Sequence, residues 1–309
     1  VSSLEKNRNS LDDQPKNVST TKLSFFNPRF LISATASVLM IFGVALAIYF
    51  TFLREIQIDS VEIQPQKIES NEWSIEIISG KSAKENEKLE VGETLETDAN
   101  SRAKVQVANI GQVEIAPNSR LQLVKTEATE HRLSLKEGKM KAFIFAPPRL
   151  FVVDTPSAVA VDLGCAYTLE VDKEGNSKLH VTSGYVALER DGRESIVPAG
   201  GMAITKKGKG LGTPYYEDVS AQFQKAVYQF DFENGGTNSL KTILTNSREK
   251  DALTLWHLLF KTNGSAREQV FRTLNKLVKL PESATKEGIL KLDKKMLKLW
   301  QEEIGIRWY

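Results

Sequence analysis

The chain has 309 residues, a length that accommodates about two domains. Hydrophobic residues make up 41% and charged residues 26%, a globular composition that excludes a fibre or a wholly disordered chain. Lysine and arginine (41 residues) nearly balance aspartate and glutamate (39 residues), so the net charge of +2 gives no support for nucleic-acid binding.

A long uncharged segment follows a polar N-terminus. Residues 1–30 have few apolar side chains and no helical stripe, which predicts a disordered tail. Residues 31–53 carry no charge over 23 positions, and a helix of that length would be about 34 Å long. Because a hydrocarbon core is about 30 Å thick, the sequence predicts one membrane-spanning helix. Its two ends and its middle are marked by Leu31, Leu53, Phe42 and Gly43.

The charges around this segment predict its orientation. Three basic residues closely precede it and two follow it, namely Lys16, Lys22 and Arg29 before, and Arg54 and Lys67 after. Basic residues are enriched on the cytoplasmic side of a membrane, so the excess favours an N-terminus inside the cell. A cleaved signal peptide is the alternative, because Ala45 and Ala47 form an A-x-A pattern. The apolar region of a signal peptide is only about 7–15 residues long, so we expect an uncleaved signal-anchor followed by a linker over residues 54–72.

Residues 73–205 show the alternation of β-strands. Apolar residues recur at every second position in short runs such as 103–107 and 167–171. The runs are separated by Gly, Asn, Asp and Pro, which favour turns. Two stretches, 133–138 and 179–184, also echo each other. The pattern predicts strands with one buried and one exposed face, arranged as a β-sandwich or as a short irregular β-helix.

Short motifs in this region, taken in order, resemble those of the FecR domain family. Trp73 and Gly92 stand in segments similar to the opening of that domain, and Thr155 and Pro156 end a strand as its Thr-Pro pair does. The other motif positions are Gly164 in a Leu-Gly-Cys-x-Tyr block, Gly184 in a V-x-x-G-x-V motif and Gly200 in the final turn. The block departs from the family at Cys165, where the family usually has Thr.

The resemblance implies a regulatory protein. FecR-like proteins are single-pass proteins of the inner membrane, and their cytoplasmic tail typically acts on an extracytoplasmic-function sigma factor. Their periplasmic β domain typically receives a signal, often from an outer-membrane receptor. The predicted span agrees with this plan and would place the C-terminal part in the periplasm. The tail of 30 residues departs from it, because it is shorter than the helical sigma-binding module and lacks a zinc-binding His/Cys set. Either the true start lies upstream or this member does not hold a sigma factor.

Residues 206–217 are expected to be a loop, and residues 218–309 change to helical periodicity. Apolar residues three and four positions apart predict four short helices, near 218–232, 251–260, 265–280 and 286–303. Ser265 and Glu268 have the spacing of a capping box at the start of the third. Such helices would form a small bundle around their own core, with binding of a partner protein as the alternative.

The residues that usually carry catalysis or metal binding are few and scattered. The single cysteine, Cys165, excludes an intrachain disulfide and is expected to be a small buried strand residue. The three histidines, His131, His180 and His257, have no metal-ligand spacing, and His257 is expected at a core or interface position of a helix. No nucleophile motif or acid–base pair assembles, so we expect no enzyme activity, no metal and no cofactor.

These observations favour a membrane-anchored, FecR-like envelope regulator. Its extracytoplasmic β domain would bind an envelope or outer-membrane protein and modulate sigma-factor-dependent transcription. The expected contacts are membrane lipid, that partner protein and a candidate sigma factor on the N-terminal side, without nucleic acid. The alternative is a structural or glycan-binding envelope protein that has no transcriptional output.

Overall fold

The computed structural model of the chain describes residues 72–80 and 88–305. The predicted tail, the predicted span marked by Leu31, Phe42, Gly43 and Leu53, and nearly all of the linker lie outside the described residues. In the part of the chain that the structure describes, no helix combines the length and apolar character needed to cross a bilayer. The described residues belong to one compact unit, in which the strands precede the helices along the chain.

Strands occupy the chain from residue 72 to residue 216. Their bounds are β1 Glu72–Ser79, β2 Lys88–Glu90, β3 Thr94–Glu96, β4 Arg102–Val107, β5 Gly111–Ile115, β6 Arg120–Glu127, β7 Glu130–Ile144, β8 Phe151–Asp154, β9 Val159–Asp162, β10 Ala166–Val171, β11 Ser177–Ser183, β12 Tyr185–Arg190, β13 Arg193–Pro198, β14 Gly201–Lys206, β15 Gly210–Leu211 and β16 Tyr215–Tyr216. The last two lie within the stretch that was expected to be a loop.

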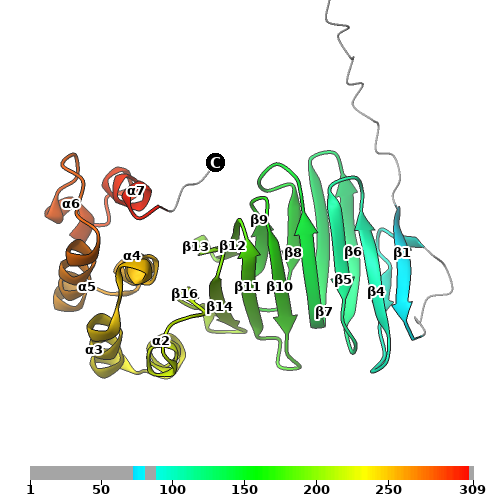
Figure 1. Ribbon diagram of the computed structural model, residues 1–309, viewed down its shortest axis with the longest axis horizontal. Coiled ribbons are helices and arrows are strands. Elements are labelled where there is room, and N and C mark those ends of the chain that lie inside the picture. The colour runs from blue at the N-terminus through cyan, green and yellow to red at the C-terminus, as the bar shows by residue number, and fades with distance from the viewer. Residues whose placement is uncertain (1–71, 81–87, 306–309) are drawn as a thin grey trace, which may run out of the picture. The chain divides into compact units, whose positions relative to one another are not determined.

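The strands form two sheets that share strand β7. The first sheet runs β1, β4, β5, the second half of β7, β10, β11 and β14, and β14 also pairs with β15 and β16. The second sheet runs β3, β6, the first half of β7, β8, β9, β12 and β13. The pairing of β7 with β8 is parallel. Figure 1 shows the strands side by side, from β1 at one end to β13 and β14 at the other.

Alternate side chains from the two sheets form the main hydrophobic core. In β4, Ala103, Val105 and Val107 are buried, whereas the residues between them point away from the core. They belong to one buried cluster with residues of the second sheet, among them Leu133 and Val153. The mainly β fold expected from the alternation is therefore confirmed, and it takes the form of two sheets facing each other.

Gly138 marks the place where β7 passes from one sheet to the other. Its φ of +99° lies in the region that favours glycine, and a β-carbon there would lie 2.4 Å from the Cα atom of Ser119. Ser119 holds the bend, because its Oγ accepts a hydrogen bond from the Lys139 backbone N–H at 2.9 Å. A single long strand can therefore contribute to both layers.

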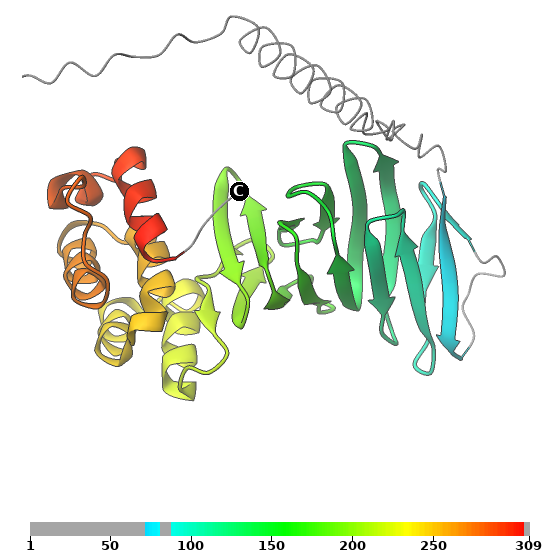
Figure 2. The same cartoon turned by 45° about the horizontal axis from the view of Figure 1, so that its top comes forward.

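The helical region expected at the C-terminus is confirmed. Its elements are α2 Ala221–Phe232, α3 Gly236–Asn246, the short 3₁₀ helix η1 Glu249–Asp251, α4 Ala252–Lys261, α5 Gly264–Leu277, α6 Lys286–Leu290 and α7 Lys294–Glu303. They surround a second core, separate from that of the sheets, which includes Phe223, Leu255, Leu274 and Trp300. Figure 2 shows these helices following the β13–β14 end of the strands.

Three details of the helices differ from the prediction. Helix α3 was not predicted, because only Leu240 and Ile243 form its buried apolar face. The last predicted helix, 286–303, is two helices, since Leu292 has a φ of +60°. Asp293 then caps α7 by accepting the Met296 N–H at 3.0 Å.

The third difference is the predicted capping box of α5. The helix begins at Gly264, with Asn263 as its N-cap residue and no side-chain hydrogen bond at the cap. Glu268 instead forms ion pairs with Arg272 at 2.8 Å and Lys286 at 2.7 Å. These basic side chains lower the pKa of Glu268 to about 2, with the Lys286 hydrogen bond as the largest cause.

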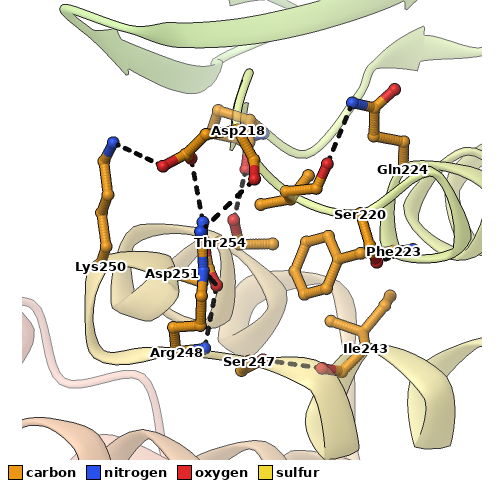
Figure 3. A network of polar contacts seen from close by, with 12 residues as sticks. Asp218, Ser220, Phe223, Gln224, Ile243, Ser247, Arg248, Lys250, Asp251 and Thr254 are labelled. Carbon is orange, nitrogen blue, oxygen red and sulfur yellow. Dashed lines mark hydrogen bonds and ion pairs between the residues drawn. The ribbon is translucent and has the colours of Figure 1, made fainter.

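A polar network ties α4 to the chain that leaves the sheets (Figure 3). The Asp251 side chain is fully buried and accepts hydrogen bonds from the Arg248 guanidinium at 2.8 and 2.9 Å. The same guanidinium binds Asp218, just before α2, at 3.0 Å. Thr254 of α4 donates a hydrogen bond to the Pro214 carbonyl at 2.8 Å. Helix α4 is therefore fixed to the connection that leads into α2, through contacts on both sides of β16.

An apolar contact supplements this network. Leu253 of α4 is buried in a small cluster with side chains from the outer face of the second sheet, namely Val152, Val161, Ala187 and Ile196. The helices thus rest directly on the sheet that ends at β13.

Candidate functional site

Two glycines from the predicted motifs lie against each other where the chain passes between the sheets. Gly164 lies between β9 and β10, Gly184 lies between β11 and β12, and their φ values are +86° and +70°. A β-carbon on Gly184 would lie 2.1 Å from the Gly164 carbonyl oxygen. Both the backbone conformation and the close approach therefore require glycine at position 184.

Gly200 has the same role at the next passage, from β13 to β14. Its φ is +73°, and its N–H donates a hydrogen bond to the Val181 carbonyl at 2.8 Å. Together with Gly138, the glycines at 164, 184 and 200 each mark a passage of the chain from one sheet to the other. The motif glycines are thus conformational requirements of the two-sheet fold.

A buried acid lies beside the first of these passages. Asp162 is 1% exposed, and its carboxylate accepts hydrogen bonds from the Gly164 N–H at 2.7 Å and the Cys165 thiol at 2.6 Å. Burial, as the largest cause, raises the pKa of Asp162 to about 6. Burial and the neighbouring carboxylate also raise the pKa of the Cys165 thiol. Cys165 is therefore an inert thiol that fixes the Asp162 carboxylate, rather than a nucleophile.

The raised pKa of Asp162 makes the stability of the protein depend on pH. Between about pH 4 and pH 6 the folded protein keeps a proton that the unfolded chain has released, so stability from this group falls as pH rises through that window. We expect the unfolding free energy of the wild type, relative to Asp162→Asn, to increase by about 2–3 kcal/mol from pH 7 to pH 4. Thermal unfolding of both proteins at several pH values measures this difference. A difference that does not change with pH would contradict the assignment.

A shallow hollow opens next to the Gly164–Gly184 contact. Its volume is about 600 Å³. Its lining comes from the end of β7 and the residues that follow it, from the β9–β10 connection, and from the ends of β10 and β11 that meet there. It includes Phe145, Pro147, Gly164 and Ser183. Phe145 is 85% exposed, the most exposed large apolar side chain in the described part of the chain. An aromatic ring held in water beside a hollow is typical of a protein-binding surface.

The backbone around Phe145 is held in place. The Phe145 N–H donates a hydrogen bond to the Ile110 carbonyl at 2.7 Å, and the Ile144 N–H donates one to the Cys165 carbonyl at 3.0 Å. The side chain of Ile144 points into the core, so its neighbour must point outward. The ring is therefore presented by a fixed backbone, which lowers the entropy cost of binding through it.

Residues 93–187 match the sequence model of a family described as FecR protein. The chain contains a FecR domain. The matched range includes Phe145, Gly164 and Gly184, so the hollow is part of that domain. The search of curated proteins found no match to the sequence.

Solved structures similar to this chain include two crystal structures of a "putative anti-sigma factor" from Parabacteroides distasonis. Both share 16% sequence identity with this chain at a TM-score of 0.37. The alignments cover 44% of this chain and 65% and 64% of the two matched chains.

The other residues singled out by the FecR resemblance lie apart from the hollow. Trp73 is buried in β1, where its indole N–H donates to the Thr126 hydroxyl at 3.0 Å. Gly92 lies in the turn between β2 and β3 with a φ of +92°. Thr155 and Pro156 form the turn between β8 and β9. The structure brings Gly164 and Gly184 together and leaves the remaining motif residues at separate turns and in the core.

Thr155 belongs to a cluster of hydroxyl groups that links the two sheets. Its hydroxyl accepts a hydrogen bond from Ser177 at 3.0 Å, and Ser157 forms hydrogen bonds of 2.6 Å with both Ser177 and Thr205. These partners lie on β11 and at the end of β14, whereas Thr155 and Ser157 lie beside β8 and β9. The threonine of the Thr-Pro motif therefore helps to hold the two sheets together through side-chain hydrogen bonds.

Sequence reasoning missed Phe145. The alternation of Met140, Ala142 and Ile144 into the core was visible and places Phe145 on the outer face, where an aromatic residue is unusual. Within residues 72–80 and 88–305, no group of three or more His, Cys, Asp or Glu side chains is arranged to hold a metal ion.

Proposed function

We propose that this chain is a membrane-anchored regulator that acts by contact. In this proposal residues 31–53 anchor it in the inner membrane with the N-terminus inside, and the FecR domain binds an envelope partner protein in the periplasm. Binding changes the transcription that depends on a sigma factor. The chain would carry no enzymatic step.

The FecR match over residues 93–187 carries the proposal, and the hollow beside Phe145 gives it a surface. Buried aromatic residues supply much of the affinity of protein interfaces, so a fixed, exposed ring within the domain is a suitable contact for a partner. Gly164, which is part of the lining, lies against Gly184. The titratable group in the lining, the thiol of Cys165, is buried and donates a hydrogen bond to the buried Asp162, which favours a contact role over catalysis.

Site-specific photo-crosslinking tests the proposed surface. A photoreactive phenylalanine analogue at position 145 is expected to capture one envelope protein in living cells, because that ring would be buried on binding. The control position is Ile78 on β1, an exposed apolar residue outside the match. Adducts that are absent at 145, or identical at 145 and 78, would contradict the proposal.

Reporter fusions test the proposed orientation. A fusion after Ser60 places a reporter just past the predicted span. A periplasmic phosphatase reporter is expected to be active there and a cytoplasmic reporter inactive. The reverse result would mean that the FecR domain faces the cytoplasm, and the envelope partner would have to be abandoned.

A further inference from the structure

Two asparagines in the chain are followed directly by glycine: Asn234 precedes Gly235, and Asn263 precedes Gly264. Both Asn-Gly pairs lie outside the FecR match, at the starts of α3 and α5, and neither lines the hollow on which the proposed function rests. Both asparagines are exposed, and their side chains form no hydrogen bond with any residue that the structure describes. The pairs share their sequence and exposure, so a difference in their reactivity has to come from the fold.

An Asn-Gly pair is chemically able to modify itself. The glycine backbone nitrogen attacks the side-chain amide carbon of the asparagine and forms a new C–N bond, which closes a five-membered imide ring. The bond from that carbon to the side-chain nitrogen breaks, and this nitrogen leaves as ammonia with the proton that the backbone nitrogen has lost. Water then opens the ring on either side and gives aspartate or isoaspartate. Glycine favours the attack because no β-carbon hinders its nitrogen or its backbone rotation.

The nitrogen of Gly264 is open to this reaction. Gly264 is the first residue of α5, and an N–H at the start of a helix has no acceptor within the helix. It also forms no hydrogen bond with the rest of the described chain. A β-carbon on Gly264 would meet no atom within 4 Å, so there is room around the reacting peptide. One contact opposes its rotation, the hydrogen bond from the Arg267 N–H to the Asn263 carbonyl at 3.2 Å.

The nitrogen of Gly235 is protected. Its N–H donates a hydrogen bond to the Gln229 carbonyl of α2 at 2.9 Å. The space around it is filled as well, because a β-carbon on Gly235 would collide with the Ser239 side chain and lie 2.9 Å from the Gln229 carbonyl carbon. Attack on Asn234 therefore requires that the turn between α2 and α3 opens first.

We propose that Asn263 is a site of spontaneous deamidation, which the fold selects over Asn234. Aspartate at this position places a carboxylate at the N-terminus of α5, where the helix dipole favours a negative charge. The nearby Arg267 guanidinium donates to the carbonyls of Leu259 and Leu290, at 3.0 and 2.8 Å, and has no ion-pair partner in the described part of the chain. Isoaspartate instead lengthens the backbone by one carbon, so this product alters the connection between α4 and α5.

Peptide mapping by liquid chromatography and mass spectrometry tests the proposal on the full chain in detergent, incubated at mildly alkaline pH. Conversion at Asn263 is expected to be at least about 10-fold faster than at Asn234, because the Gly235 hydrogen bond has to open before attack. Isoaspartate is expected beside aspartate, since direct hydrolysis of the side chain gives aspartate alone. Equal rates at the two sites, faster conversion at Asn234, or a product without isoaspartate would overturn the proposal.

The same incubation in concentrated urea separates the effect of the fold from that of the sequence. In the unfolded chain both glycine nitrogens are accessible, so the two rates are expected to agree within about 3-fold. If the preference for Asn263 were as large in urea as in the folded protein, neighbouring residues in the sequence would be its cause, and selection by the fold would be wrong.

A pair of glycine variants identifies the attacking nitrogen. Gly264→Ala is expected to slow conversion at Asn263 by about 10-fold, because the new β-carbon hinders the attack. Gly236→Ala is the matched control: the φ values of Gly264 and Gly236 are +48° and +50°, and a β-carbon on either would meet no atom within 4 Å. The two variants should therefore lose similar stability, while Gly236→Ala leaves the rate at Asn263 unchanged. Equal slowing by both would contradict attack by the Gly264 nitrogen, and the urea comparison decides the case if either variant fails to fold.

Discussion

Gly184→Ala is expected to destabilise the protein by about 3 kcal/mol or more. A non-glycine residue in a left-handed conformation costs about 1–2 kcal/mol, and the φ of Gly184 is +70°. The new methyl group would also lie 2.1 Å from the Gly164 carbonyl oxygen, which belongs to backbone and cannot rotate away. The passages between β9 and β10 and between β11 and β12 would have to separate. Thermal unfolding of the full chain, followed by near-ultraviolet circular dichroism, measures the loss.

Gly192→Ala is the matched control. Gly192 has a φ of +71°, almost the same as that of Gly184, but a β-carbon there meets no atom within 4 Å. The substitution should therefore cost only the conformational part, about 1–2 kcal/mol. Equal destabilisation by the two substitutions would show that the contact with Gly164 contributes nothing, and the structural role of the V-x-x-G-x-V motif would have to be revised.

Arg248→Met is expected to destabilise the protein by about 2–3 kcal/mol. The substitution leaves the fully buried Asp251 carboxylate without the guanidinium that neutralises it (Figure 3), and an unpaired buried charge is costly. The expected loss lies below that of a fully buried pair because Arg248 is itself 44% exposed on its side chain. Since Arg248 links Asp251, at the start of α4, to Asp218 just before α2, hydrogen exchange in α4 should accelerate as well.

Lys250→Met is the control for Arg248→Met. Lys250 lies two residues away and forms an exposed ion pair with Asp218, at 3.2 Å, but its side chain is not an ion-pair partner of Asp251. Exposed ion pairs contribute little, so the unfolding midpoint should hardly change. Equal losses in the two variants would mean that the Asp218 contact, and not the buried Asp251 pair, holds the helices in place.

The sequence was sufficient for the fold class, because the two periodicities that define strands and helices are local. Alternation over 103–107 and the apolar positions of 218–232 both correspond to observed elements, β4 and α2. The break at Leu292 was not predictable in the same way, since it depends on the Asp293 cap and on a positive φ at a residue that rarely adopts one.

The candidate site was less predictable, because it is made by contacts between distant residues. Gly164 and Gly184 are 20 positions apart in the sequence. Neither motif indicates that a β-carbon at position 184 would collide with the backbone of Gly164. The expected core or interface position of His257 was predictable, because it follows from the apolar residues on either side of it, and the residue is buried in α4.

The most direct test of the account measures the transcripts of four host strains. They carry the wild-type chain, Phe145→Ala, Ile78→Ala or a deletion of the gene. Protein abundance is measured in parallel, so that a loss of folding is separated from a loss of contact. We expect Phe145→Ala to reproduce the transcriptional change of the deletion at normal abundance, and Ile78→Ala to behave as the wild type. A deletion strain whose transcripts match the wild type would contradict a regulatory role for the FecR domain.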